Sequence, residues 1–167
     1  MRITELIVIA TVVAGTGTAA VIDLRTRRVP NVLTAAMTAA GMALAVAGLG
    51  RVGVAAACAG CVIGAALMLP GHVFGATGAG DVKLLAAVGA SLGPALTLRA
   101  FVVTAIAGGA IALAVAAGRG RLRQTVTATT RLAVAGETGG IEDPAADNRF
   151  AYAPAIAIGA TLVALGW

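Results

Sequence analysis

The sequence is poor in charged and aromatic side chains. Of its 167 residues, 11% are charged and 3% are aromatic, whereas 59% are hydrophobic. A soluble domain usually carries about a quarter charged residues and about half apolar ones. Twelve basic and seven acidic side chains are too few to cover a water-soluble globule of this length. This scarcity of charge excludes an ordinary cytosolic enzyme and a disordered tail. It predicts one domain over residues 1–167 whose outer surface contacts lipid.

Cysteine is equally scarce, because the chain holds only Cys58 and Cys61, both within the apolar run AAACAGCVIG. A zinc site needs a second C-x-x-C pair, and a redox C-x-x-C is expected near a βαβ pattern. Both cysteines are therefore interpreted as small packing residues. We predict no metal and no organic cofactor. The net charge of +5 comes without neighbouring aromatic residues, so it indicates membrane orientation and not a nucleic-acid partner.

Charged residues divide the chain into six charge-free stretches. They are 6–22, 29–50, 52–80, 84–98, 100–118 and 150–167. A helix needs roughly 20 apolar residues to cross the bilayer core. The fourth stretch is short, but Lys83 and Arg99 flank it and can extend to the two interfaces. We predict an all-α bundle of six transmembrane helices, at about 3–22, 31–49, 52–70, 82–98, 100–118 and 150–167.

The positions of Lys and Arg predict the orientation. With the N-terminus outside, nine of these residues fall on the inner side and three on the outer side. The inner ones are Arg25, Arg27, Arg28, Lys83, Arg119, Arg121, Arg123, Arg131 and Arg149. Because cytoplasmic loops carry the excess of basic residues, we expect both termini outside the cytoplasmic membrane and the polar loop 119–149 in the cytoplasm.

Small residues recur four positions apart in two of the predicted helices. Ala56, Gly60 and Gly64 form one such ridge, which allows a neighbouring helix backbone to approach closely. In the first helix a similar ridge runs from Thr11 toward Asp23. Residues at this spacing share one face of a helix, so Asp23 is expected to point into the bundle.

Asp23 and Asp81 are the two acidic residues at the ends of predicted spans. A carboxylate at membrane depth is a functional-site hypothesis by default. Two crossings separate the pair, so both lie on the same side of the membrane in either orientation. Two aspartates that approach at low dielectric share one proton. An aspartic protease uses this arrangement, in which the ionised carboxylate takes a proton from water and the protonated one polarises the scissile carbonyl.

The alternative is that the two aspartates are separate interfacial carboxylates, Asp23 paired with Arg25 or Arg27 and Asp81 with Lys83. Glycines ahead of Asp81, in GATGAGDVKLL, favour the catalytic interpretation. Gly78 and Gly80 would let a substrate backbone approach the carboxylate without obstruction by side chains.

Three segments resemble the type IV prepilin leader peptidases, which are intramembrane aspartic proteases. They are IDLRTRRVPN, GAGDVKLLAAVGASLGP and FAYAPAIAIG, and they occur in the family's order over nearly the whole chain. The resemblance implies that Asp23 and Asp81 are catalytic, and it matches Gly78, Gly80 and Lys83 to motif positions expected to contact substrate. It also implies a pilin-like precursor as substrate, whose short basic leader is removed at the cytoplasmic membrane face.

The chain departs from the longer family members at one place. Those proteins insert a zinc-binding domain with two C-x-x-C pairs between the first two helices, whereas here only Leu24–Val29 separate Asp23 from Pro30. The short form is similar to the peptidases of tight-adherence pilus systems and archaeal preflagellin peptidases. The resemblance therefore does not carry over the N-methylation performed by the longer enzymes.

Two other functions remain open from the sequence. A small transporter or proton-coupled carrier could use paired aspartates, although a carrier is expected to hold its acids near the bilayer midplane. A structural component of a pilus assembly machine would need neither aspartate. Among other polar residues, His72 is interpreted as an incidental loop histidine, and Tyr152 and Trp167 as interfacial anchors at the two ends of the last helix.

Overall fold

The computed structural model describes residues 3–118 and 152–167, apart from the side chain of Ala116. These residues form six helices, which confirms the all-α class. The helices are α1 (Ile3–Thr26), α2 (Asn31–Val46), α3 (Val54–Val73), α4 (Ala79–Leu92), α5 (Pro94–Gly118) and α7 (Ala153–Ala164). The predicted cytoplasmic loop 119–149 lies outside the described residues.

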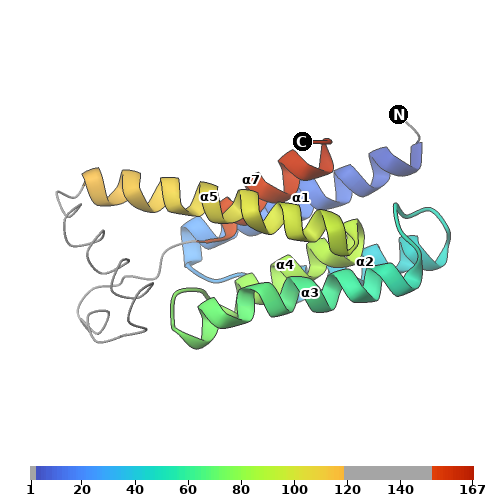
Figure 1. Ribbon diagram of the computed structural model, residues 1–167, viewed down its shortest axis with the longest axis horizontal. Coiled ribbons are helices and arrows are strands. Elements are labelled where there is room, and N and C mark those ends of the chain that lie inside the picture. The colour runs from blue at the N-terminus through green and yellow to red at the C-terminus, as the bar shows by residue number, and fades with distance from the viewer. Residues whose placement is uncertain (1–2, 119–151) are drawn as a thin grey trace.

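Helix α4 is the centre of the bundle. It contacts each of the other five helices, and these form a ring around it in the order α1, α2, α3, α5, α7 and back to α1. Figure 1 shows α1, α5 and α7 along one side of the molecule and α2 and α3 along the other. Asp81 and every residue from Leu84 to Leu92 are buried. From Leu84 to Leu92, α4 is therefore buried on all sides, and the five surrounding helices form the outer surface of the bundle.

Three of the described helices are long and apolar enough to cross a membrane, namely Ile3–Thr26, Val54–Val73 and Pro94–Val115. Helices α2 and α7 are apolar but shorter, with 16 and 12 residues. Helix α4 has only 14 residues, which corresponds to about 21 Å at 1.5 Å per residue. Because protein encloses α4, it does not need the roughly 20 apolar residues that lipid contact demands.

The boundary between the fourth and fifth helices differs from the prediction. The sequence analysis placed it at Arg99, between 82–98 and 100–118. In the structure α4 ends at Leu92, and Arg99 lies within α5. Gly93 makes the turn with a φ of 76°, a conformation that glycine adopts without a Cβ penalty, and Pro94 suits the first turn of the next helix. The Gly-Pro pair, not the charge, sets this boundary.

The other helix ends lie a few residues from their predicted positions. Helix α1 extends past residue 22 to Thr26, α2 ends at Val46 before 49, α3 continues from Val54 past residue 70 to Val73, and α7 is shorter than 150–167. The first of these differences matters for function, because it places Asp23 within the last turn of α1.

Glycines bring the backbones of α3 and α4 into direct contact. A Cβ atom added at Gly60 would meet the carbonyl oxygen of Gly89, and one added at Gly89 would meet the carbonyl oxygen of Gly60. Gly64 faces the backbone of Leu85 in the same way. The predicted ridge is thus confirmed at Gly60 and Gly64. Ala56 is only partly buried, and Ala57 occupies the buried position instead.

Alanine at Gly60 should destabilise the protein by about 1–3 kcal/mol, because the added methyl group would push two helix backbones apart. Gly17→Ala is the matched control, since nothing lies within 4 Å of a Cβ at Gly17. Thermal unfolding of both variants in detergent measures the difference. If Gly60→Ala unfolded at the wild-type temperature, the close α3–α4 contact would be wrong.

Candidate active site

A cleft of about 460 Å³ opens where α1 and α3 end and α4 begins. It is lined by Asp23, Arg27, Arg28, Val29, His72, Gly75, Ala76, Thr77, Gly78, Ala79, Gly80 and Asp81. The two aspartates singled out from the sequence therefore share one cleft, although they lie on different helices. Both carboxyl groups are buried, at 6% and 5% exposed, on the walls of the same cleft.

Asp23 is held by the two helices at the ends of the described chain. Its side chain is only 6% exposed, which confirms that it points into the bundle. The Oδ2 atom accepts a hydrogen bond of 3.3 Å from the backbone N–H of Ala153, at the start of α7. The N-terminus of a helix carries a partial positive charge. The Ala153 N–H and the nearby guanidinium of Arg27 both favour a negative charge on this carboxyl group, and they oppose the larger effect of its burial, which disfavours that charge.

Asp81 lies in the first turn of α4 and is 5% exposed. Its Oδ2 accepts a hydrogen bond of 3.0 Å from the backbone N–H of Gly78, while its own N–H donates to the Gly78 carbonyl at 3.0 Å. The first bond is the half of a capping box that a glycine N-cap allows, in which the aspartate side chain satisfies a backbone donor at the helix start. Asp81 is therefore fixed by the local fold of the glycine-rich turn.

Gly80 lets the segment after α1 approach this turn. A Cβ atom at Gly80 would lie 2.9 Å from the Cβ of Val29 and 3.3 Å from the Val29 carbonyl oxygen. At Gly78 an added Cβ would lie 3.3 Å from Oδ2 of Asp81. The two motif glycines thus have separate structural effects: Gly80 allows Val29 to approach, and Gly78 leaves room for the Asp81 carboxylate.

The connector between α1 and α2, residues 27–30, is short and locally ordered. The N–H of Arg27 donates to the carbonyl of Asp23 at 2.8 Å, and Arg27 has a φ of 54°. A residue in this left-handed conformation is a common helix terminator. The Thr26 hydroxyl bonds the Arg28 carbonyl at 3.1 Å, and Asn31 begins α2. The residues after Asp23 consequently turn back at once toward α4.

His72 is part of the cleft and not of a loop. It lies in the last turn of α3, and its Nδ1 is 3.2 Å from the carbonyl oxygen of Thr77, to which it can donate. Gly75, with a φ of 74°, makes the turn between these two residues. His72 therefore closes the α3–α4 connection directly beside the aspartates.

Tyr152 lies at the start of α7, outside the cleft lining, and the sequence predicted only an anchoring role for it. A Cβ atom at Gly108 of α5 would lie 2.9 Å from the Tyr152 ring, so the ring packs closely against that glycine. Tyr152 also interacts electrostatically with Asp81. Trp167, the other proposed anchor, is 83% exposed. The resemblance of FAYAPAIAIG to a family segment was the available signal for Tyr152, but that resemblance assigned it no role.

Lys83 and the cysteines lie away from the cleft lining. The Nζ atom of Lys83 donates a hydrogen bond of 2.9 Å to Oδ1 of Asn31, at the start of α2. Cys58 is exposed and Cys61 is partly buried, and both are free thiols on α3. Within residues 3–118 and 152–167, no group of three or more His, Cys, Asp or Glu side chains is placed to hold a metal ion.

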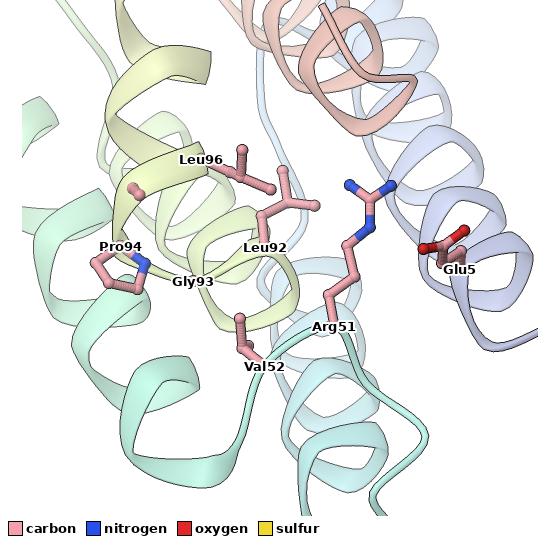
Figure 2. A pocket seen from close by; sticks show the side chains of 8 residues that line it. Glu5, Arg51, Val52, Leu92, Gly93, Pro94 and Leu96 are labelled. Carbon is pink, nitrogen blue, oxygen red and sulfur yellow. The ribbon is translucent and has the colours of Figure 1, made fainter. Parts of the chain in front are cut away.

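A second pocket, of about 390 Å³, lies at the other end of α4. Its lining includes Glu5, Arg51, Leu92 and Pro94. Figure 2 shows the Arg51 side chain extending toward α1, on which Glu5 lies. Because one pocket adjoins the start of α4 and the other its end, Glu5 is a partly exposed acid remote from the aspartate pair.

Two buried carboxylates thus share one cleft at the end of a helical bundle. The sequence pattern of the Type IV leader peptidase family matches residues 8–113, which is more than half of the chain and includes Asp23 and Asp81. The chain belongs to this family. Searches of curated proteins and of solved structures give no match. The matched range ends before α7, although α7 contributes the N–H group that contacts Asp23.

The contact between Tyr152 and Gly108 can be tested without an activity assay. The chain contains one tyrosine, so incorporation of 3-fluorotyrosine gives a single ¹⁹F NMR signal. Gly108→Ala should shift this signal, because the new methyl group would displace the ring. Gly109→Ala, with nothing within 4 Å of its Cβ, should leave it unchanged. Equal spectra for the two variants would place the ring elsewhere.

Proposed function

We propose that this protein is an intramembrane aspartic endopeptidase that removes the short basic leader from type IV pilin-like precursors. The observation that carries the proposal is the position of Asp23 and Asp81, both buried and both lining one cleft. Membership of the type IV leader peptidase family supports protease activity and pilin-like precursors as the substrates. The peptidase domain is proposed to span residues 1–167.

The proposed reaction uses the two carboxyl groups in different protonation states. The ionised carboxylate takes a proton from a water molecule, and the resulting hydroxyl attacks the scissile carbonyl carbon. The protonated partner donates a hydrogen bond to the carbonyl oxygen, which stabilises the negative charge that develops there. Transfer of a proton to the departing amine then breaks the C–N bond. Water supplies both new end groups, so no metal or organic cofactor is required.

Substrate is proposed to reach the aspartates along the glycine-rich turn. Gly78 and Gly80 line the cleft directly before Asp81, and residues without a side chain leave space for an extended peptide backbone. The cleft is open to the solvent side of the bundle through exposed residues such as His72 and Ala76. A leader segment can therefore enter from the aqueous side while the substrate's apolar helix stays in the bilayer.

The proposed site faces the cytoplasm. This proposal rests on the six-span topology predicted from the sequence, with both termini outside, which would put nine basic residues on the inner side and three on the outer side. Arg27 and Arg28 border the cleft, so the site lies at the end of the bundle where basic residues gather. The cytoplasmic membrane is the proposed location.

A proton-coupled carrier is the weaker alternative. Carriers hold their ionisable residues near the middle of the membrane, whereas Asp23 is in the last turn of α1 and Asp81 in the first turn of α4. The centre of the ring is filled by the apolar part of α4. N-methylation is not proposed, because the connector 27–30 leaves no place for the zinc-binding insertion of the longer enzymes.

Replacing either aspartate by asparagine should abolish leader removal, with a loss of about 100- to 10,000-fold in kcat, because asparagine cannot exchange a proton. The assay is cleavage of a candidate pilin precursor in cells lacking their own prepilin peptidase, at matched membrane abundance. Glu5→Gln is the control, since Glu5 borders the pocket at the other end of α4. This variant should cleave at the wild-type rate.

Cleavage by either asparagine variant would disprove the two-aspartate mechanism. If the wild-type protein left every pilin precursor encoded beside its gene intact, the peptidase assignment would be wrong and the carrier would be tested next. Loss of activity in Glu5→Gln as well would show that the variants report on folding and not on catalysis.

A further inference from the structure

Two contacts join the segment from Val29 to Asn31 to the start of α4, and they fall on either side of Asp81 in the sequence. Before Asp81, Gly80 meets Val29, at a spacing that leaves no room for a Cβ. After Asp81, the Lys83 Nζ donates to Oδ1 of Asn31 at 2.9 Å. These residues are 52 positions apart in the chain, so the bond is a tertiary contact between the starts of α2 and α4.

The same connector is attached to Asp23. Its first residue, Arg27, donates its N–H to the Asp23 carbonyl, and only Arg28, Val29 and Pro30 separate it from Asn31. Proline at residue 30 has a fixed φ, here −66°, which limits the freedom of this short segment. A continuous path of contacts therefore leads from the backbone of Asp23 through the connector to the residues that flank Asp81.

We propose that Asn31 and Lys83 are positioning residues that set the separation of the two aspartates. The proposal rests on the proposed function and gives Lys83 a role other than contact with substrate. The Lys83–Asn31 bond lies outside the cleft lining, so it acts through the connector and through the first turn of α4. Without it, the contact between Val29 and Gly80 and the packing of α2 against α4 remain.

The chemistry of the pair specifies which substitutions preserve the bond. The lysine ammonium group has only donors, and the asparagine Oδ1 is an acceptor, so the bond is charge-assisted and stronger than a neutral one. Aspartate at residue 31 keeps an acceptor oxygen and suits the first turn of a helix. Arginine at residue 83 keeps the donors. Alanine at residue 31 removes the acceptor, and methionine at residue 83 removes the charged donor.

The first measurement is steady-state cleavage of a pilin precursor by purified protein in lipid. Asn31→Ala and Lys83→Met should each lower kcat about 10- to 100-fold with little change in KM, because a small displacement of catalytic groups costs rate and not substrate affinity. The double variant should be no slower than the slower single variant. Asn31→Asp and Lys83→Arg should retain most of the activity.

Thr18→Val is the matched control for loss of an exposed hydrogen bond. The Thr18 hydroxyl bonds only the Ala14 carbonyl of its own helix in the described contacts, at 2.7 Å. This variant should keep the wild-type kcat and KM.

A second measurement does not depend on activity. Leu24 and Ala79 are exposed positions near Asp23 and Asp81. After Cys58 and Cys61 are replaced by alanine, nitroxide labels on Leu24→Cys and Ala79→Cys give the distance between these two positions by dipolar EPR. The distance distribution should broaden in Asn31→Ala and in Lys83→Met and should narrow again in Asn31→Asp. Thr18→Val should leave it unchanged.

An unchanged distance distribution in both Asn31→Ala and Lys83→Met would overturn the proposal. So would a raised KM in Lys83→Met with normal kinetics in Asn31→Ala, which would mean that Lys83 binds substrate. If the wild-type protein cleaves no precursor, the proposed function fails, and the EPR distances still decide whether the pair holds the two helix ends together.

Discussion

The enclosure of α4 by five other helices is the constraint on which the rest of the structure depends. A helix buried on every side can present only small or apolar residues, and its neighbours must offer glycine wherever backbones meet, as Gly60 does against Gly89. Close packing leaves α4 little freedom to slide or rotate. The first turn of α4 carries Asp81, so the packing along its length determines where this carboxyl group lies.

Asp23 is positioned differently, through three separate segments. Helix α1 carries it, the connector 27–30 bonds its carbonyl group, and the start of α7 donates to its side chain. The connector also contacts the glycine directly before Asp81, through Val29. The candidate site is therefore made where several chain ends meet at one end of the bundle. Helix α4 holds Asp81 in a fixed position, and the surrounding segments place Asp23 in the same cleft.

The sequence predicted the aspartate pair because counting membrane crossings requires no knowledge of packing. It also predicted Gly60 and Gly64 as contact residues, since small residues at helical spacing have few other uses. The sequence-based predictions missed features that depend on how the helices pack against one another. Apolar residues give the same sequence pattern whether lipid or protein covers them, so the sequence did not predict that α4 is the enclosed helix. The charge of Arg99 led to a predicted boundary there, whereas the turn is at Gly93. The environment of Tyr152 depends on Gly108, which lies 44 residues earlier in the chain.

The contact between Ala153 and Asp23 has a consequence for the order of synthesis. The two residues are 130 positions apart, and at about 5–20 residues per second the ribosome needs on the order of ten seconds to make the chain between them. Throughout that interval Asp23 lacks its backbone donor, and the ring around α4 is open between α1 and α5. The newly made protein therefore completes the hydrogen bonding of Asp23 only after α7 has been made, when most of the chain is already in place.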